Sequence, residues 1–310
     1  MTKIVIQNKP KRFNKVINVD GDKSISIRSL LIGSQSYGIC KISNLSNSED
    51  IMSTIIGLKK LGVRILRKKK KYYIFGNGLN SFKLKKNIVI DAGNSGTFAR
   101  LLLGLLIKST NTIKIKGDKS LSRRDFLRVI LPLKEFGAIF FTKKKIGLPI
   151  KILGSEFIRP IKYLEKKGSA QCKSSVMLAA LNAPGTTIIK AKKSRDHTEN
   201  FYKFLKLPIK IYKTKKFDVI KVKGEYQFKS FDYDIPGDVS SSAFFIILTL
   251  LSNNSKLKIK NVNVNPSRIG FIKIINKMGA KVKISNKKKV MGELVGDIFV
   301  KSQNNFKGLN

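Results

Sequence analysis

The amino-acid sequence predicts an α/β protein built from inside-out, barrel-like domains, with buried parallel helices at the centre and sheets outside them. Three observations support this prediction. One pattern occurs four times at a spacing of about 70 residues, the first helix of each copy is apolar on every side, and short strand-like segments follow it. A helix without a polar face has to be buried all round, so the sheets are expected to lie outside it.

The four copies all begin at a glycine. One to three small or hydroxyl residues follow each glycine, and then an almost wholly apolar stretch. The copies read GDKSISIRSLLIGS from Gly21, GNSGTFARLLLGLL from Gly93, GSAQCKSSVMLAAL from Gly168 and GDVSSSAFFIILTL from Gly237. Since Ser, Asn and Asp are favoured at helix N-termini, a buried helix is expected to begin just after each glycine.

Each unit continues with a strand, a second helix and a strand hairpin, which makes an α-β-α-β-β repeat. The second helix, as in residues 49–61, places apolar residues on one face and lysines on the others, a pattern typical of an outer helix. Three of these helices are expected to end on a glycine, at Gly62, Gly137 and Gly279. In the third copy Pro208 is expected to end the helix instead.

The sequence carries 63 lysines and arginines against 19 acidic residues, a formal net charge of +44. Such a charge raises the expectation of a nucleic-acid partner. Only 11 of these cations are arginines, and six of the 11 lie inside the repeat motifs, whereas the lysine runs do not. We interpret the runs at 68–71, 143–145 and 287–289 as solvated hairpin tips. A basic nucleic-acid-binding protein is kept as the alternative function, with steeply salt-dependent binding as its expected property.

Other features exclude several classes of protein. The longest apolar runs, 101–107 and 243–251, are far shorter than the roughly 18 residues of a membrane span, and the first ten residues lack the apolar core of a signal peptide. The two cysteines form no CxxC motif, and His197 is the single histidine. The sequence therefore predicts a cytoplasmic protein with no membrane partner, no metal and no disulfide.

The N-termini of the buried helices are expected to form a pocket for anions. If these helices run parallel, their first turns emerge at one end of the core, with free backbone N–H groups and about half a positive charge each. The same turns carry lysine, arginine, serine and asparagine side chains. Because the planar guanidinium of arginine binds oxyanions through two hydrogen bonds, the pocket suits phosphate or carboxylate groups.

An ordered set of motifs carries a family resemblance from about residue 16 to the last residue. The motifs read GDKSIS-x-R, GNSGT-x-x-R, GDKSL-x-x-R, SAQ-x-KS with LNAPGTT, SRDHTE, PGD-x-SS-AFF and NPSR-x-G. Together they resemble the 5-enolpyruvylshikimate-3-phosphate (EPSP) synthases of the enolpyruvyl transferase family. The resemblance implies transfer of the enolpyruvyl group of phosphoenolpyruvate to the 5-hydroxyl of shikimate 3-phosphate with release of phosphate, a step of aromatic amino-acid biosynthesis. It implies a monomer that needs no cofactor and binds small-molecule substrates, without a specific nucleic acid.

The resemblance also assigns residues to the two substrates. Shikimate 3-phosphate is expected to contact Lys23, Ser24, Arg28, Ser169, Ala170, Gln171, Ser194 and Arg195. Phosphoenolpyruvate is expected to contact Lys23, Asn94, Gly96, Arg124 and Gln171, and Lys23 is the expected catalytic residue. One departure from the family pattern is Asp125, which stands where a proline usually follows Arg124. We expect Asp125 to pair with Arg124 and to weaken its hold on phosphoenolpyruvate.

The resemblance implies two domains of three units each, closing around the substrates, whereas four units are present here. Strands at about 3–7 and 15–19, within residues 1–19, are expected to belong to the second domain. Residues 20–233 form the complete, phosphoshikimate-binding domain, and residues 234–310 the first unit of an incomplete second domain. We therefore expect a chain truncated by about two units, without the C-terminal catalytic carboxylates and with catalysis lost or very slow. A non-catalytic fragment that binds phosphoshikimate is the second alternative, and exposed apolar helix faces are expected in the incomplete domain.

Overall fold

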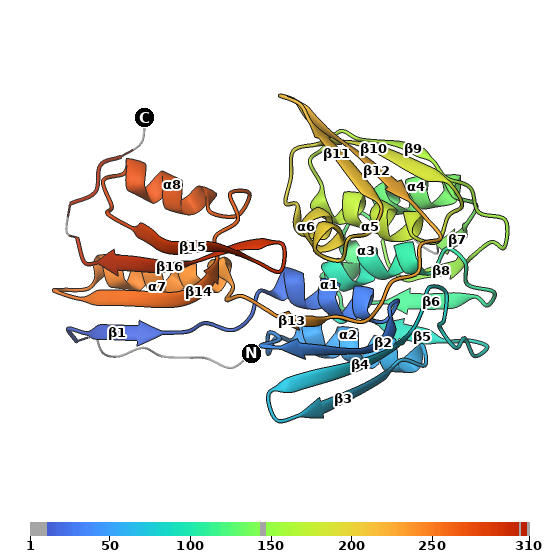
Figure 1. Ribbon diagram of the computed structural model, residues 1–310, viewed down its shortest axis with the longest axis horizontal. Helices are drawn as coiled ribbons and strands as arrows, with labels where there is room; N and C mark the ends of the chain where they lie inside the picture. Colours follow the sequence, from blue (N-terminus) through green and yellow to red (C-terminus); the bar gives the residue numbers. More distant parts are fainter. Residues whose placement is uncertain (1–10, 143–146, 304, 309–310) are drawn as a thin grey trace. The chain divides into compact units, whose positions relative to one another are not determined.

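The computed structural model describes residues 11–142, 147–303 and 305–308. The chain divides into two compact units, which we call the large unit (Lys23–Ile235) and the small unit (Met1–Asp22 with Pro236–Asn310). Both units mix helices with four-stranded sheets (Figure 1). The predicted α/β class is therefore confirmed.

Three nearly fully buried helices form the centre of the large unit (Figure 1). They are α1 (Lys23–Gly33), α3 (Gly96–Leu105) and α5 (Ala170–Ala180), and each begins two or three residues after a repeat glycine. Helix α3 packs against both α1 and α5. Because these helices have no polar face, they cover one another and leave the sheets outside, as the sequence predicts.

Each repeat of the large unit adds an outer helix. These helices are α2 (Glu49–Lys60), α4 (Leu127–Glu135) and α6 (His197–Phe204). Gly62 and Gly137 follow α2 and α4 with positive φ angles of 84° and 115°, the left-handed conformation expected at a helix C-terminus. After α6, which ends at Phe204, it is Lys206 that takes a positive φ, 53°, so the helix ends four residues before Pro208.

Three four-stranded sheets surround the helices of the large unit. Corresponding strands of the repeat follow one another in the same spatial order in all three sheets. Their bounds are β13 (Asp232–Asp234), β2 (Tyr37–Ser43), β4 (Lys71–Asn77) and β3 (Arg64–Lys68); β5 (Val89–Asp91), β6 (Ile113–Lys116), β8 (Ile150–Leu153) and β7 (Ile139–Thr142); and β9 (Lys162–Glu165), β10 (Thr186–Lys192), β12 (Phe217–Lys223) and β11 (Ile209–Lys213). In each sheet the first strand named is parallel to the second, and the remaining neighbours are antiparallel. The shared order reflects the threefold repeat.

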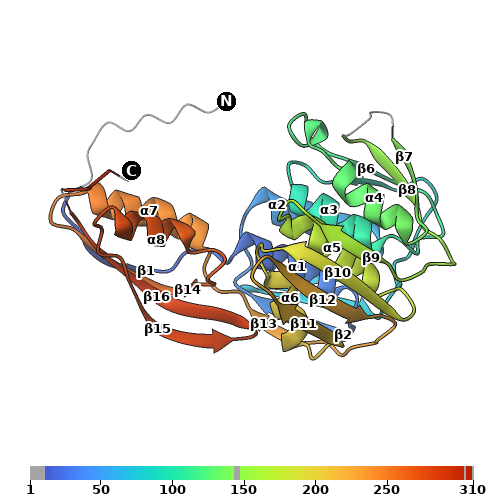
Figure 2. The ribbon, with the colours of Figure 1, turned by 90° about the horizontal axis from the view of Figure 1, so that it is seen from above.

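The small unit contains a fourth copy of the repeat. It consists of α7 (Val239–Leu251), β14 (Lys256–Asn263), α8 (Gly270–Lys277), β15 (Lys283–Val290) and β16 (Glu293–Lys301), with β1 (Asn14–Ile17) parallel to β14 at the sheet edge. Both helices cover one face of this sheet (Figure 2). The strand expected at residues 3–7 lies outside the described residues.

Helix α7 is less covered than its three counterparts. Ile246 and Leu250 are buried against the sheet, but Phe244 and Leu251 are 79% and 70% exposed. The expected exposure of an apolar helix face in this unit is thus confirmed. No helix in the described part of the chain is both long and apolar enough to span a membrane.

A buried arginine ties the start of the fourth repeat together. Arg268, from the NPSR motif, contacts Asp22 through Nη1 (2.8 Å) and Asp238 through Nη2 (3.2 Å). Its Nη2 also donates to the hydroxyl of Ser240 (2.9 Å). Asp238 caps α7 by accepting from the backbone N–H of Ser240 (2.7 Å). The guanidinium thus joins the chain before α1 to the first turn of α7.

Of the three lysine runs predicted to be hairpin tips, the run at 287–289 lies elsewhere in the structure. Residues 68–71 are exposed at the β3–β4 turn, as predicted, and 143–145 lie outside the described residues. Residues 287–289 are exposed but lie within β15, so the prediction of a hairpin tip there was wrong. The turn falls instead at Met291 and Gly292, which have positive φ angles of 47° and 87°. Glycine favours this backbone conformation more than lysine does.

Candidate functional site

Arg28 lies in the second turn of α1 and is only 3% exposed. Its Nε donates to Thr198 Oγ1 (2.8 Å), its Nη2 to Ser174 Oγ (3.0 Å) and its Nη1 to the backbone oxygen of Ser24 (2.8 Å). The two hydroxyl oxygens are 2.6 Å apart. Arg28 therefore joins α1 to α5 and α6, and these hydrogen bonds fix the position of its charge.

Arg100 links the first turns of α3 and α5. Its Nη1 donates to Gln171 Oε1 (2.7 Å), and Gln171 Nε2 donates to Thr97 Oγ1 (2.9 Å). The guanidinium lies 4.7 Å from the ring centre of Phe126, a cation–π distance. Because both partners of Gln171 come from α3, the orientation of its amide is set by that helix.

A second chain of hydrogen bonds orients Arg124. Its Nη2 donates to Asn94 Oδ1 (2.9 Å), and Asn94 Nδ2 donates to Asp118 Oδ2 (2.6 Å). The backbone N–H of Leu121 donates to Asp118 Oδ1 (2.7 Å) and holds the pKa of this carboxyl below its usual range. All three side chains are exposed, so the guanidinium of Arg124 is oriented and still accessible to a ligand.

Gly96 starts α3 between the two arginines. A Cβ atom at this position would lie 2.9 Å from Arg100 Nη1 and 3.3 Å from Arg124 Nη1. The preceding residue, Ser95, caps the helix by accepting from the backbone N–H of Phe98 (3.3 Å). The absence of a side chain at Gly96 thus leaves room for both guanidinium groups at a helix N-terminus.

The expected pair between Arg124 and Asp125 is not formed within the described residues. Asp125 Oδ1 accepts instead from the backbone N–H of Leu127 (2.8 Å), at the start of α4. Because Arg124 is held by Asn94 and Asp125 by this cap, the prediction that Asp125 pairs with Arg124 was wrong.

The start of α5 is held by Glu165, the last residue of β9. Its Oε2 accepts from the backbone N–H of Ser169 (2.9 Å). Ser169 caps α5 by accepting from the backbone N–H of Cys172 (3.3 Å), and Ala170 and Gln171 follow as the first helical residues. These three residues are partly exposed, so they remain accessible to a ligand.

Ser194 and Arg195 lie in the loop between β10 and α6. The hydroxyl of Ser194 is buried and has no hydrogen-bond partner among the described residues. Arg195, next to it, is exposed. A buried hydroxyl without a partner is unfavourable, so this position fits an acceptor supplied by a ligand.

Lys23 is the first residue of α1, and Ser24 the second. Lys23 Nζ lies 3.2 Å from Asp50 Oδ2, in the first turn of α2. The lysine side chain is 45% exposed. The ion pair orients Lys23 without burying it, so its ammonium remains accessible to an anionic ligand.

All eleven sequence-predicted residues lie in the large unit. They occur in the first two turns of helices or in the loops just before helices, and they are Lys23, Ser24, Arg28, Asn94, Gly96, Arg124, Ser169, Ala170, Gln171, Ser194 and Arg195. The contacts of Arg28 and Gln171 bring parts of α1, α3, α5 and α6 together. No contact described for Ser194 ties it to the rest of the set.

Several supporting residues were missing from the predicted site. They include Arg100, Asp118, Ser174 and Thr198. Arg100 had a usable signal, because it is one of the few arginines inside a repeat motif. The others are common polar residues whose partners lie far away in sequence, so spacing alone could not identify them.

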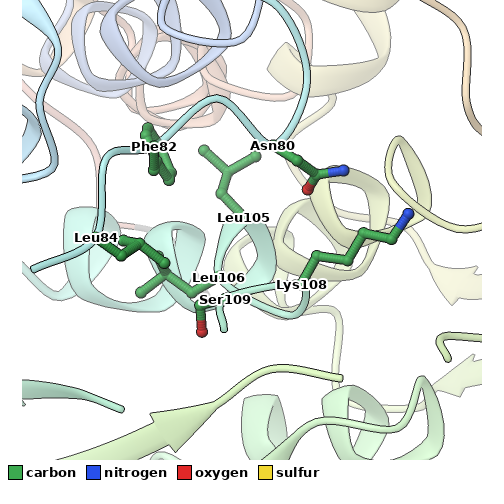
Figure 3. A pocket seen from close by; sticks show the side chains of 7 residues that line it. All are labelled: Asn80, Phe82, Leu84, Leu105, Leu106, Lys108 and Ser109. Carbon is green, nitrogen blue, oxygen red and sulfur yellow. The ribbon is translucent and has the colours of Figure 1, made fainter. Parts of the chain in front are cut away.

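None of these residues lines a small cavity of about 20 Å³ in the large unit, whose lining is shown in Figure 3. Its lining includes Phe82 and Leu84, together with Leu105 and Leu106 at the C-terminal end of α3. Gly96 lies at the opposite end of that helix, where it begins. This volume holds about one water molecule. Among the described residues, no group of three or more His, Cys, Asp or Glu side chains could hold a metal ion.

The fold and the site define a protein with cationic, hydroxyl-rich helix N-termini inside a repeated α/β unit, an arrangement suited to binding oxyanions. The family model for EPSP synthase (3-phosphoshikimate 1-carboxyvinyltransferase) matches residues 7–302. The chain therefore belongs to the EPSP synthase family.

Individual relatives agree with this result. The chain is 40% identical to a 3-phosphoshikimate 1-carboxyvinyltransferase of Petrotoga mobilis over 94% of its own length and 67% of the relative's. It is 39% identical to the enzyme of that name from Caldicellulosiruptor bescii, over 95% and 68%. The EPSP synthase structure from Acinetobacter baumannii superposes with a TM-score of 0.85 at 31% identity, covering 96% of this chain and 67% of that one. The chain thus spans about two thirds of the length of these relatives.

Proposed function

We propose that the large unit binds shikimate 3-phosphate at the helix N-termini and that the chain serves enolpyruvyl transfer from phosphoenolpyruvate. Membership of the EPSP synthase family supports this proposal. The relatives described above carry the name of that activity. Both substrates are polyanions, and the candidate site offers cations and backbone N–H groups rather than an apolar pocket.

One observation carries the proposal: the first two turns of the buried helices are joined by polar side chains rather than by apolar ones. Gln171 joins α5 to α3 through Arg100 and Thr97. Arg28 joins α1 to α5 through Ser174. Helix N-termini held this close repel one another, and a bound phosphate or carboxylate offsets that repulsion.

The residues divide into two groups in this proposal. The binding group for shikimate 3-phosphate consists of Lys23, Ser24, Arg28, Ser169, Ala170, Gln171, Ser194 and Arg195. The binding group for phosphoenolpyruvate consists of Lys23, Asn94, Gly96, Arg124 and Gln171. Ser194 and Arg195 suit the phosphate of shikimate 3-phosphate, since a buried hydroxyl without a partner lies beside an exposed guanidinium.

The reaction forms a bond between the 5-oxygen of shikimate 3-phosphate and C2 of phosphoenolpyruvate. The hydroxyl proton passes to a base, and an acid protonates the C3 methylene. Loss of a proton from the methyl group so formed then restores the double bond, as the bond between C2 and the phosphate oxygen breaks and inorganic phosphate leaves. In this scheme Lys23 contacts both substrates and acts as a proton donor, and Arg124 stabilises the charge that develops on the leaving phosphate.

Calorimetric titration tests the binding step. We expect shikimate 3-phosphate to bind one to one, and shikimate, which lacks the phosphate, to bind at least about tenfold more weakly. A parallel titration with phosphoenolpyruvate and an assay for released phosphate then measure the second substrate and the transfer. Equal affinity for shikimate and shikimate 3-phosphate would contradict the assigned phosphate contacts.

We also propose that small anions, rather than nucleic acids, are the specific partners of a monomeric, cytoplasmic chain. The arginines assigned to the substrates lie in the first two turns of a helix or in loops that precede helices, whereas the lysine run at 68–71 is exposed at a hairpin turn. Substitution of Lys69 and Lys70 by alanine should therefore leave the affinity for shikimate 3-phosphate unchanged. Loss of a salt-dependent RNA or DNA complex in the same variant would favour the alternative function.

A further inference from the structure

A buried ion pair connects α5 to α6 in the large unit. Lys173 Nζ lies 2.5 Å from Glu199 Oε1, and the two side chains are only 1% and 4% exposed. The other carboxylate oxygen of Glu199 is buried and has no hydrogen-bond partner in the described residues. Burial raises the pKa of Glu199, against the opposing effect of Lys173.

A buried ion pair of this kind adds little net stability to a fold. Removing two charges from water costs several kcal/mol per ion, and apolar residues of similar size often serve stability equally well or better. Here the cost is increased by the unpartnered oxygen of Glu199. The stability of the α5–α6 contact therefore does not by itself account for the pair.

The residues next to Lys173 and Glu199 in the sequence are the two hydroxyl partners of Arg28. Ser174 follows Lys173 on α5, and Thr198 precedes Glu199 on α6. Both hydroxyls accept hydrogen bonds from Arg28. The ion pair and the Arg28 contacts are thus adjacent cross-links between the same two helices, and the first fixes the helix spacing on which the second depends.

The pair also lies just behind two groups of residues assigned to the phosphorylated substrate. Ser169 and Gln171 begin α5 within four residues of Lys173. Ser194 and Arg195 precede α6, five and four residues before Glu199. A change in the spacing of the two helices would therefore move one group relative to the other.

We propose that Lys173 and Glu199 form a positioning pair that sets the separation between the start of α5 and the start of α6, and thereby the fit of shikimate 3-phosphate. This inference rests on the proposed function. Neither side chain is accessible to a substrate, so the pair acts through Arg28 and through the two helix starts. Its effect falls on recognition of the phosphate rather than on chemistry.

The test separates affinity from stability. In the double variant Lys173→Met/Glu199→Leu both charges are replaced by apolar groups, and we expect a urea midpoint equal to or above that of the unsubstituted chain. We expect its dissociation constant for shikimate 3-phosphate to rise at least tenfold. The preference for shikimate 3-phosphate over shikimate should fall, because the phosphate contacts are misplaced.

Two further variants complete the design. Glu199→Gln keeps the size of the side chain and provides a second measurement if the double variant does not fold. Lys258→Met/Asp297→Leu removes a less buried ion pair of 3.1 Å in the small unit, and its affinity should stay within twofold of the unsubstituted chain. A stable double variant with unchanged affinity and preference would overturn this inference alone. Absence of binding by the unsubstituted chain would contradict the proposed function and the inference with it.

Discussion

Arg100 donates a hydrogen bond of 2.7 Å to the side-chain oxygen of Gln171, which joins the start of α5 to the first turns of α3. Gln171 returns a hydrogen bond of 2.9 Å to α3 through Thr97. Because a glutamine amide can rotate freely when it has one partner, the second bond is what fixes its orientation. The structure thus presents a preoriented amide and a guanidinium on one surface, at two helix N-termini.

Replacing Arg100 by leucine should weaken binding of shikimate 3-phosphate. The change removes a cation from the site and leaves Gln171 with Thr97 alone. We expect the dissociation constant, measured by calorimetry, to rise about tenfold, which corresponds to about 1.4 kcal/mol. Arg64→Leu is the matched control, because Arg64 is exposed on β3 and lies over the ring of Phe75. Equal affinities of the two variants would contradict the role of Arg100.

Gly96→Ala should affect phosphoenolpyruvate more than shikimate 3-phosphate. The added methyl group would lie 2.9 Å from Arg100 Nη1 and 3.3 Å from Arg124 Nη1, so both guanidinium groups have to shift. We expect the dissociation constant for phosphoenolpyruvate to rise about tenfold and that for shikimate 3-phosphate to rise less. Gly104→Ala is unsuitable as a control, because its Cβ would lie 2.2 Å from the backbone oxygen of Ser175.

Gly270→Ala supplies the control for this experiment, since nothing lies within 4 Å of a Cβ atom at Gly270. Its affinity for both ligands should match that of the unsubstituted chain. An unchanged affinity of Gly96→Ala for phosphoenolpyruvate would show that the two arginines do not bind this ligand.

Arg268→Met should destabilise the small unit. The substitution leaves the carboxylates of Asp22 and Asp238 buried without their guanidinium partner. Breaking a buried ion pair from one side costs about 3–5 kcal/mol. Hydrogen exchange of the backbone amides of β14 and β16 measures the loss. Lys258→Met, which breaks a partly exposed pair with Asp297, should cost about 0–1 kcal/mol, and an equal effect of the two variants would be inconsistent with this account.

Asp118 should make stability sensitive to acid. Its pKa is lowered in the folded chain by the backbone N–H of Leu121, so the folded state binds fewer protons than the unfolded state near the ordinary carboxyl pKa. Stability from this group is therefore present above a pH of about 4 and is lost as the pH falls through the lowered pKa. Urea unfolding at several pH values should show a larger advantage of the unsubstituted chain over Asp118→Asn at pH 6 than at pH 3. A constant difference would contradict the prediction.

The sequence predicted the repeat architecture because the signal was redundant. Four apolar helices, each preceded by a glycine and capping residues, leave few arrangements that bury them all. The φ angle of Lys206 and the position of 287–289 within β15 were missed for a local reason. Both depend on how a hairpin or helix end packs against its neighbours, and lysine carries little information about backbone conformation.

The site was predicted in part for a related reason. Residues at helix starts, such as Ser169 and Gly96, stand out in the sequence because capping has a fixed spacing. The partners that orient them do not. Thr198 and Ser174 meet Arg28 only after three helices have packed, and the Lys173–Glu199 pair joins residues 26 positions apart on different helices. For Asp125, adjacency to Arg124 in the sequence suggested an ion pair, whereas the structure forms a helix cap.

A crystal structure of the chain with shikimate 3-phosphate is the most direct test of the central claim. We expect the phosphate to accept hydrogen bonds from Ser169, Ser194 and Arg195, with the ring beside Gln171. Contact between the phosphate and the exposed lysines at 68–71, or a complex in which the starts of α1 and α5 remain free of ligand, would contradict it.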